Sequence, residues 1–256
     1  MIGDITGYMD VAQMTLYAFW LFFFLLVLYL HRENKREGYP LQTDDYRNVE
    51  VVGFPALPDP HSYKMLHGAD DVVVPGPNPP EYDVKAKRVN PTYGSPFYPT
   101  GDPLVDGVGP AAWAVRPDFP DLTFEGGEPK IVPMRIASEF KVAERDPDPR
   151  GKEVVGLDDK VAATVTDIWV DRSEPQVRYL EIEVAANGNR TLVPITLSRI
   201  RGDGTVKVHC LKAEHFANIP TLASMDQITL QEEDRICAYI GGGSLFATRE
   251  RQEPIL

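Results

Sequence analysis

The sequence contains few of the residues from which most enzyme and metal sites are built. It has two cysteines, Cys210 and Cys237, and five histidines in 256 residues. Two cysteines are too few for a disulfide framework, and the histidines show no metal-ligand spacing. The sequence also has no Walker motif, nucleophile elbow or CxxCH haem-attachment motif. We therefore expect two reduced thiols, no metal site, and a protein that is not an enzyme.

Positive charge is also scarce. The chain has 38 Asp and Glu against 26 Lys and Arg, which gives a net charge of −12. An acidic surface repels phosphate backbones, so we expect no nucleic-acid partner. Because anionic lipids repel such a surface too, any membrane association has to come from burial of apolar residues. The composition is otherwise that of a folded protein, with 43% hydrophobic and 25% charged residues.

One long apolar run stands near the N-terminus. No residue from Val11 to Leu30 is charged. A helix of this length spans about 30 Å, the thickness of the hydrocarbon core of a bilayer. A signal peptide fits poorly, because no Lys or Arg precedes the run and no small-residue cleavage site follows it. The sequence therefore predicts a transmembrane helix over residues 11–31.

The charges that flank this run predict its orientation. Residues 1–10 contain two acids and no Lys or Arg, whereas Arg32, Lys35 and Arg36 follow the run. Lys and Arg accumulate on the cytoplasmic side of membrane proteins. We therefore expect residues 1–10 outside and the bulk of the chain in the cytoplasm.

Proline dominates the next segment, residues 32–129. Most of the chain's 23 prolines lie between Pro40 and Pro120, and proline is excluded from helix interiors and inner strands. Apolar residues still recur there, which is unlike a polar, disordered tether. We expect an extended, ordered segment that is stabilised by lying on another surface.

From residue 130 the pattern changes to short apolar runs separated by turns. Two turn sequences, Asn187-Gly188-Asn189 and Gly202-Asp203-Gly204, favour hairpins because Gly and Asn accept positive φ. Strands close in sequence pair antiparallel, so residues 130–256 are predicted to form a small antiparallel β-barrel or sandwich. A helix capped by Thr229 is expected to end at Gly241 to Gly243. The predicted strands are Lys130 to Ile136, Glu153 to Leu157, Val161 to Val170, Val177 to Ala185, Arg190 to Ile195 and Thr205 to Cys210.

Acidic residues gather around one predicted turn. Asp167 and Asp171 are four residues apart on a strand and should share a face. Glu174 follows them, and Arg178 is nearby. Two interpretations stay open: a solvated strand face and turn, or a chain of carboxylates that passes protons to a buried acceptor. The second has a physical basis because burial raises a carboxyl pKa and a neighbouring Arg adjusts it.

Six stretches of the sequence, taken in order, resemble the H subunit of the purple bacterial photosynthetic reaction centre. The resemblance covers nearly the whole chain and implies that the β domain is a PRC-barrel. The stretches are REGYP (Arg36 to Pro40), PTGDPLVDGVGPAAW (Pro99 to Trp113), KIVPMR (Lys130 to Arg135), DIWVD (Asp167 to Asp171), RYLE (Arg178 to Glu181) and EEDRICAY (Glu232 to Tyr239).

This resemblance implies a structural subunit without pigment of its own. Such a chain caps the cytoplasmic face of the L and M subunits, stabilises the quinone sites and assists proton transfer to the secondary quinone during light-driven cyclic electron transport. Bacteriochlorophyll, bacteriopheophytin, ubiquinone or menaquinone, carotenoid and non-haem iron are expected on L and M. Membrane lipids, a cytochrome subunit and a light-harvesting antenna ring are further candidate partners. The implied location is the bacterial inner (intracytoplasmic, or chromatophore) membrane, with a periplasmic N-terminus.

The resemblance also implies roles for single residues. By position after DIWVD, Glu174 matches the acidic relay residue of the family, and Asp171 and Arg178 match its neighbours. The histidines that gather protons in some members before the KI-P motif are missing here. Glu125 or Glu128 would replace them, although a carboxyl pKa near 4 makes a poorer buffer at pH 7.

Two other classes of protein remain as alternatives. One is a membrane-tethered enzyme of unknown chemistry, which the missing site motifs oppose. The other is a PRC-barrel module that binds RNA-processing partners, which the transmembrane run and the net charge of −12 oppose.

Overall fold

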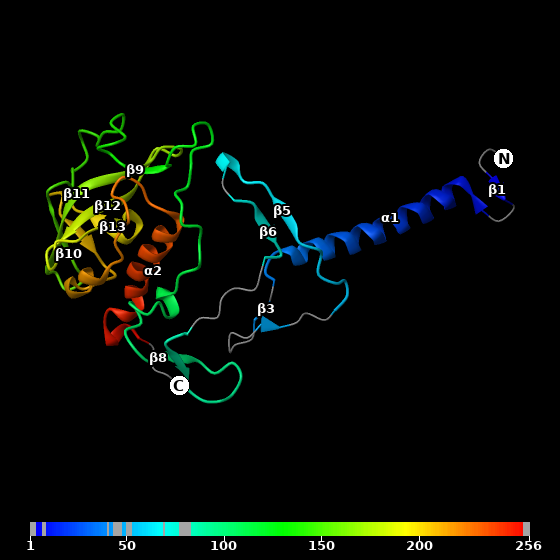
Figure 1. Cartoon of the computed structure of the whole chain (residues 1–256), viewed down its shortest axis with the longest axis horizontal. Coiled ribbons are helices and arrows are strands. Elements are labelled where there is room, and N and C mark those ends of the chain that lie inside the picture. The colour runs from blue at the N-terminus through cyan, green and yellow to red at the C-terminus, as the bar shows by residue number, and fades with distance from the viewer. Residues whose placement is uncertain are drawn as a thin grey trace. The chain divides into compact units, whose positions relative to one another are not determined.

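The structure is a computed structural model that describes residues 4–6, 9–39, 41–42, 48–49, 53–68, 70–76 and 83–252. It comprises two compact units, Met1–Asp83 and Val84–Leu256. Each unit is described by itself below, and Figure 1 shows the course of the chain through both.

A long helix, α1 (Val11–Glu33), is the main element of the first unit (Figure 1). Asp10 caps its N-terminus: the side-chain oxygen accepts the Gln13 N–H at 2.7 Å and so satisfies one free donor of the first turn. None of its residues is buried. Within the described residues it is the one helix that is long and apolar enough to cross a membrane. The predicted N-terminal apolar helix is confirmed.

Short antiparallel ladders accompany α1. At the C-terminal end of the helix, the Arg36 guanidinium donates to the carbonyl oxygens of Asp59 at 2.7 Å and Val74 at 3.3 Å, so this end of α1 is tied to the proline-rich segment. Residues 43–47, 50–52 and 77–82 of that segment lie outside the described residues. The pairs are β1 (Asp4–Thr6) with β2 (Met9–Asp10), β3 (Leu41–Gln42) with β4 (Asn48–Val49), and β5 (His61–Tyr63) with β6 (Val72–Val74).

A seven-stranded sheet forms the body of the second unit (Figure 1). The order is β13-β12-β11-β10-β15-β14, and β9 also pairs with β11. The two long strands bury consecutive residues, Ile168 to Asp171 on β11 and Tyr179 to Ile182 on β12, so both faces of the curled, half-barrel sheet are covered there. The strands are β9 (Ile131–Pro133), β10 (Glu153–Val155), β11 (Val161–Asp171), β12 (Gln176–Val184), β13 (Arg190–Pro194), β14 (Ser198–Ile200) and β15 (Val206–Val208). The predicted mainly-β domain is confirmed.

Both predicted hairpin turns are present. Gly188, between β12 and β13, has φ +70°, and Gly204, between β14 and β15, has φ +87°. One pairing departs from the predicted antiparallel arrangement, because β10 and β15 run parallel with Val154 opposite Val206. These two strands are far apart in sequence, so the rule that neighbouring strands pair antiparallel does not apply to them.

The C-terminal helix α2 (Leu230–Phe246) begins where the sequence predicts. The Glu232 N–H donates to Thr229 Oγ1 at 3.1 Å, and the Thr229 N–H donates to Glu232 Oε2 at 2.9 Å, which is a capping box. The predicted end at Gly241 to Gly243 is wrong, since the helix continues through these residues. At Gly242 the missing side chain lets the helix pack closely against Ala111, because a Cβ there would lie 2.5 Å from the Cβ of Ala111.

The core of the second unit includes part of the proline-rich segment. Leu104 and Ala111 are buried in the same cluster as the strands and α2. Residues after Ala111 are bonded to α2: the Ala114 N–H donates to Asp234 at 2.6 Å, and the Gln231 side chain donates to the Ala114 carbonyl at 3.1 Å. This part of the segment therefore lies on its own chain. The domain boundary predicted between residues 129 and 130 stays a prediction.

The remaining short elements connect these parts. One more ladder joins β7 (Ala86–Arg88) to β8 (Phe97–Pro99). The 3-10 helices are η1 (Asn34–Arg36), η2 (Leu66–Gly68), η3 (Gly109–Ala111), η4 (Ile195–Leu197), η5 (Ala213–Asn218) and η6 (Arg249–Arg251).

Candidate proton-transfer site

The turn between β11 and β12 carries two of the predicted relay residues. Asp171 ends β11 and is 2% exposed. Its Oδ1 accepts the N–H groups of Ser173 at 2.8 Å and Glu174 at 3.1 Å, which folds the turn over the carboxylate. Glu174 is exposed at the tip of this turn. We call residues 171–174 the relay turn, because a buried and an exposed carboxylate lie within it.

Two cationic side chains join a second turn, residues 121–130, to the relay turn. Lys130 Nζ lies 3.5 Å from Asp121 Oδ2 and 3.8 Å from Asp171 Oδ2. Arg172 Nη1 lies 2.8 Å from Glu128 Oε2. Each cation thus connects an exposed carboxylate of residues 121–130 to the relay turn.

Of the two carboxylates predicted to replace the missing histidines, one is in contact with the relay turn. Glu128 is that residue, through its ion pair with Arg172. Glu125 is exposed on the same 121–130 segment. Asp121 was not predicted as a site residue, and only the folded position of Lys130 shows its link to Asp171.

Arg178, on β12, forms an ion pair with a residue of α2. Its Nη2 lies 3.9 Å from Glu233 Oε1, and the buried Tyr179 donates its hydroxyl hydrogen to the same oxygen. Burial raises the pKa of Tyr179 far above its usual value, and the neighbouring Cys237 and Glu233 raise it further. Tyr179 therefore stays protonated and donates to Glu233.

Asp167 lies in a different set of residues, centred on Glu181 and called here the Glu181 cluster. The Glu181 side chain has no exposed surface and accepts hydrogen bonds from four groups. Asp167 Oδ2 accepts from Arg135 Nη1 at 3.2 Å, and Asp226 Oδ1 accepts from Arg135 Nη2 at 3.1 Å. The four donors to Glu181 are Arg135 Nη1 at 2.7 Å, Trp169 Nε1 at 3.0 Å, Thr166 Oγ1 at 2.8 Å and Arg190 Nη2.

The Glu181 cluster keeps the Glu181 carboxylate charged. Burial by itself raises the pKa of Glu181, but the hydrogen bonds from Arg135, Trp169 and Thr166 outweigh it, so the pKa lies below its usual value. A carboxylate that holds its charge so firmly is a poor proton carrier near neutral pH. The geometry therefore separates Asp167, which has Arg135 as its cation, from Asp171, which has Lys130.

Sequence reasoning did not single out Glu181 as a site residue. It faces Asp167 across the β11–β12 ladder, and the pairing has irregular register between Val165 and Asp167. That cross-strand position is fixed only when the strands pair. Within the described residues, no group of three or more His, Cys, Asp and Glu side chains is placed to hold a metal ion.

Two family models match the chain. Residues 3–136 match the model described as photosynthetic reaction centre, H-chain N-terminal region, and residues 141–214 match the PRC-barrel domain. The first match alone covers more than half of the 256 residues. The chain belongs to the reaction-centre H-chain family. Helix α2 lies beyond the residues that either model matches.

Family membership confirms the resemblance found in the sequence. An H chain is a structural, accessory subunit of the photosynthetic reaction centre, and its family associates with the L and M subunits without binding pigment. Together with α1, the match makes this H chain a single-pass protein of the inner membrane.

Proposed function

We propose that this H chain caps the cytoplasmic side of L and M, shields the quinone sites and passes protons toward the secondary quinone. The observation that supports this best is the relay turn, where buried Asp171 lies beneath exposed Glu174. Lys130 connects Asp171 to the exposed Asp121. Carboxylates at two depths, joined by one cation, are what a proton path from water to a covered acceptor requires.

Protons would enter this path at carboxylates instead of histidines. Asp121, Glu125 and Glu128 are exposed on the 121–130 segment. Lys130 and Arg172 each pair with one of them and supply fixed positive charge next to the relay turn.

The chemistry of the complex would lie on its partners. We propose that L and M hold the bacteriochlorophyll, bacteriopheophytin, quinone, carotenoid and non-haem iron, and that this chain supplies no catalytic site. A cytochrome subunit, an antenna ring and membrane lipids are proposed as further neighbours on the same family grounds.

We further propose that the second unit is cytoplasmic and the N-terminus periplasmic. Arg32, Lys35 and Arg36 at the C-terminal end of the apolar run support this, with no Lys or Arg before it. Protease added outside intact spheroplasts should leave the β domain uncut, and protease added to inside-out vesicles should cut it. Cleavage from outside would contradict this orientation.

The test of the relay is Glu174→Gln in the assembled reaction centre. Glutamine keeps the size of the side chain and cannot carry a proton, so proton-coupled reduction of the secondary quinone after a second flash should slow by roughly tenfold or more. The kinetics would be followed by flash absorption from pH 6 to 9.

The matched control is Glu153→Gln, which removes an exposed carboxylate from β10, outside the relay turn. Its second-flash kinetics should equal those of the wild type. Equal kinetics for Glu174→Gln, with the complex fully assembled, would contradict the relay.

A further inference from the structure

Large apolar side chains are exposed along a short stretch of the first unit. Six of them lie between residues 54 and 73, with 44% to 82% of their surface exposed. Single exposed apolar residues are common on proteins, but a group of them marks a surface that is covered in the working molecule. The six are Phe54, Tyr63, Met65, Leu66, Val72 and Val73.

Most of this stretch is the hairpin of β5 and β6, which is fixed to the C-terminal end of α1 (Figure 1). Asp59, just before β5, has its carboxylate 3.6 Å from Arg32, and its carbonyl accepts from Arg36 at 2.7 Å. Arg36 also donates to the carbonyl of Val74, the last residue of β6. Tyr63 and Val74 line a cavity of about 620 Å³ together with Arg36. Both outer ends of the hairpin are therefore held at the helix end.

The rise of the helix gives the depth of the hairpin in the membrane. Leu30 is the last residue of the uncharged run, and Arg32 and Arg36 follow it by about 3 Å and about 9 Å along the axis. The headgroup layer on each side of the hydrocarbon core is about 5–8 Å thick. Lys35 donates to the carbonyl of the proline after Phe54. The hairpin and Phe54 are thus attached to α1 at headgroup depth.

The apolar residues lie on both faces of the hairpin. Side chains alternate along a strand, so Val73 points to one face, and Tyr63 and its cross-strand neighbour Val72 point to the other. Met65 and Leu66 follow β5 at the turn. A protein partner that docks on one face leaves the opposite face in water. Immersion in the headgroup layer covers both faces and the turn at once.

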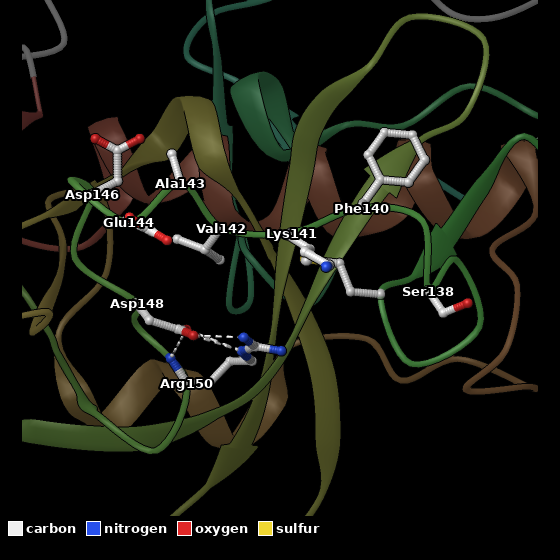
Figure 2. A pocket seen from close by; sticks show the side chains of 10 residues that line it. Ser138, Phe140, Lys141, Val142, Ala143, Glu144, Asp146, Asp148 and Arg150 are labelled. Atoms are coloured by element: carbon white, nitrogen blue, oxygen red, sulfur yellow. Dashed lines mark hydrogen bonds and ion pairs between the residues drawn. The ribbon is translucent and has the colours of Figure 1, made fainter.

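A surface loop of the second unit shows the contrasting pattern. Loop 138–150 lines a cavity of about 520 Å³ (Figure 2) and has seven charged residues among thirteen, four acids and three bases. Asp148 and Arg150 of this loop form an ion pair at 2.6 Å. The hairpin, residues 61–74, has three charged residues among fourteen. The loop is suited to contact with water, and the hairpin is suited to burial.

The charges of the hairpin indicate the class of lipid. Asp59, Asp70 and Asp71 stand against Lys64 as the only cation between residues 54 and 74. Anionic headgroups attract clusters of Lys and Arg, which this stretch does not have. Its insertion has to depend on burial of apolar side chains among zwitterionic phospholipids.

We propose that the hairpin of β5 and β6, with Phe54, inserts into the headgroup layer of zwitterionic phospholipids on the side of the membrane where α1 ends. Because Arg36 ties both hairpin ends to α1, the inserted hairpin also limits the tilt and vertical movement of the helix. The proposal depends on α1 crossing the membrane and is independent of the proton relay.

Photocrosslinking in the assembled reaction centre, in its native membrane, identifies what covers the hairpin. A photoreactive benzoylphenylalanine in place of Val73 should crosslink to phospholipid. The matched control is the same replacement of Val161, a similarly exposed valine that follows the charged Asp159 and Lys160, and it should give no lipid adduct. A crosslink from position 73 to L, M or any other protein overturns the proposal, as does no crosslink or equal lipid labelling at both positions.

Fluorescence quenching measures the insertion of the full-length chain in phosphatidylcholine nanodiscs. Val73→Trp adds a fluorophore to the three native tryptophans, and subtraction of the wild-type signal isolates it. Lipid brominated near the glycerol should quench roughly half or more of the added fluorescence. Val161→Trp should show no quenching.

The lipid class is tested by replacing half of the phosphatidylcholine with phosphatidylglycerol. Quenching of Val73→Trp should stay the same, because burial and not charge drives insertion. Quenching that appears only with phosphatidylglycerol overturns the zwitterionic assignment. Unquenched Val73→Trp in both lipids overturns insertion itself.

Discussion

Glu181 shows how this fold carries charge in its interior. Removing a carboxylate from water is expensive, and an ion pair offsets that cost only where hydrogen bonds satisfy the remaining lone pairs. Both oxygens of Glu181 meet this condition: Thr166 and Arg190 bind Oε1, and Arg135 and Trp169 bind Oε2. These donors come from β11, from β13 and from Arg135, the second residue after β9, so one side chain connects three parts of the sheet.

We predict that Glu181→Ala lowers the free energy of unfolding by about 3–5 kcal/mol, because it leaves Arg135 without its buried partner. Asp148→Ala removes a half-exposed ion pair with Arg150 and should cost less than about 1 kcal/mol. Urea unfolding of the second unit measures both. Equal losses would show that Glu181 is no more important than a surface carboxylate.

The same residue predicts a pH dependence. The pKa of Glu181 is lower in the folded state than in the unfolded chain, so its contribution to stability is present above the ordinary value of about 4.5 and is lost as pH falls through the folded pKa. The urea midpoint of the wild type should therefore fall below about pH 4.5. Glu181→Gln should fall less steeply there, and an unchanged slope would contradict the assignment.

The three consecutive glycines of α2, Gly241 to Gly243, differ in how closely neighbouring residues pack against them. Alanine is the better helix former by about 1 kcal/mol, so glycine is favoured in a helix only where a side chain would not fit. A Cβ on Gly242 would meet backbone and side-chain atoms of Ala111, and one on Gly243 would meet the Cys210 carbonyl. At Gly241 the nearest atom would be Leu197 Cδ1 at 4.0 Å.

We predict opposite effects for two neighbouring substitutions. Gly241→Ala should raise the free energy of unfolding by up to about 1 kcal/mol, because the methyl group meets no atom closer than Leu197 Cδ1 at 4.0 Å and the helix gains propensity. Gly242→Ala should lower it by about 1–3 kcal/mol, because residues 109–111 must move away from the helix. Urea midpoints decide between them, and a stabilising Gly242→Ala would contradict the close packing.

The elements were predictable to different degrees. The sequence predicts Val161 to Val170 and Val177 to Ala185, and β11 and β12 match these ranges within one residue at each end. Runs rich in apolar and β-branched residues between clear turns are local signals. The three-residue β14 was not predicted, because its pairing with β15 defines it more than its own composition does.

At the scale of the whole molecule, the division of the chain lies at Asp83 and Val84. The segment after Val84 is rich in proline, yet Leu104, Val108 and Ala111 are buried on the β domain. A cation–π contact at 4.4 Å between Arg235 and Trp113 adds to the hydrogen bonds that hold this segment on α2. The second unit therefore requires residues well before its first long strand.

Two fragments test whether the second unit needs the residues before Lys130. A fragment from Val84 to Gln252 should unfold cooperatively, because it contains the whole core of the second unit. A fragment from Lys130 to Gln252 lacks Leu104 and Ala111, exposes the face of α2 and should unfold at a clearly lower urea concentration. Near-ultraviolet circular dichroism of the buried Trp169 reports both transitions, and equal midpoints would contradict the shared core.

The sequence by itself determined the apolar helix, the β character of the second half, the turns and the family, because each depends on local patterns or on the order of short motifs. It also placed Asp171 and Glu174 at one turn, since they are neighbours in the chain. Only the tertiary structure decided that Lys130 joins Asp121 to Asp171, that Asp167 belongs with Glu181, and that Gly242 and Gly243 pack instead of ending the helix. These contacts join residues far apart in sequence, and their charge and packing energies depend on burial and distance, which exist only in the folded chain.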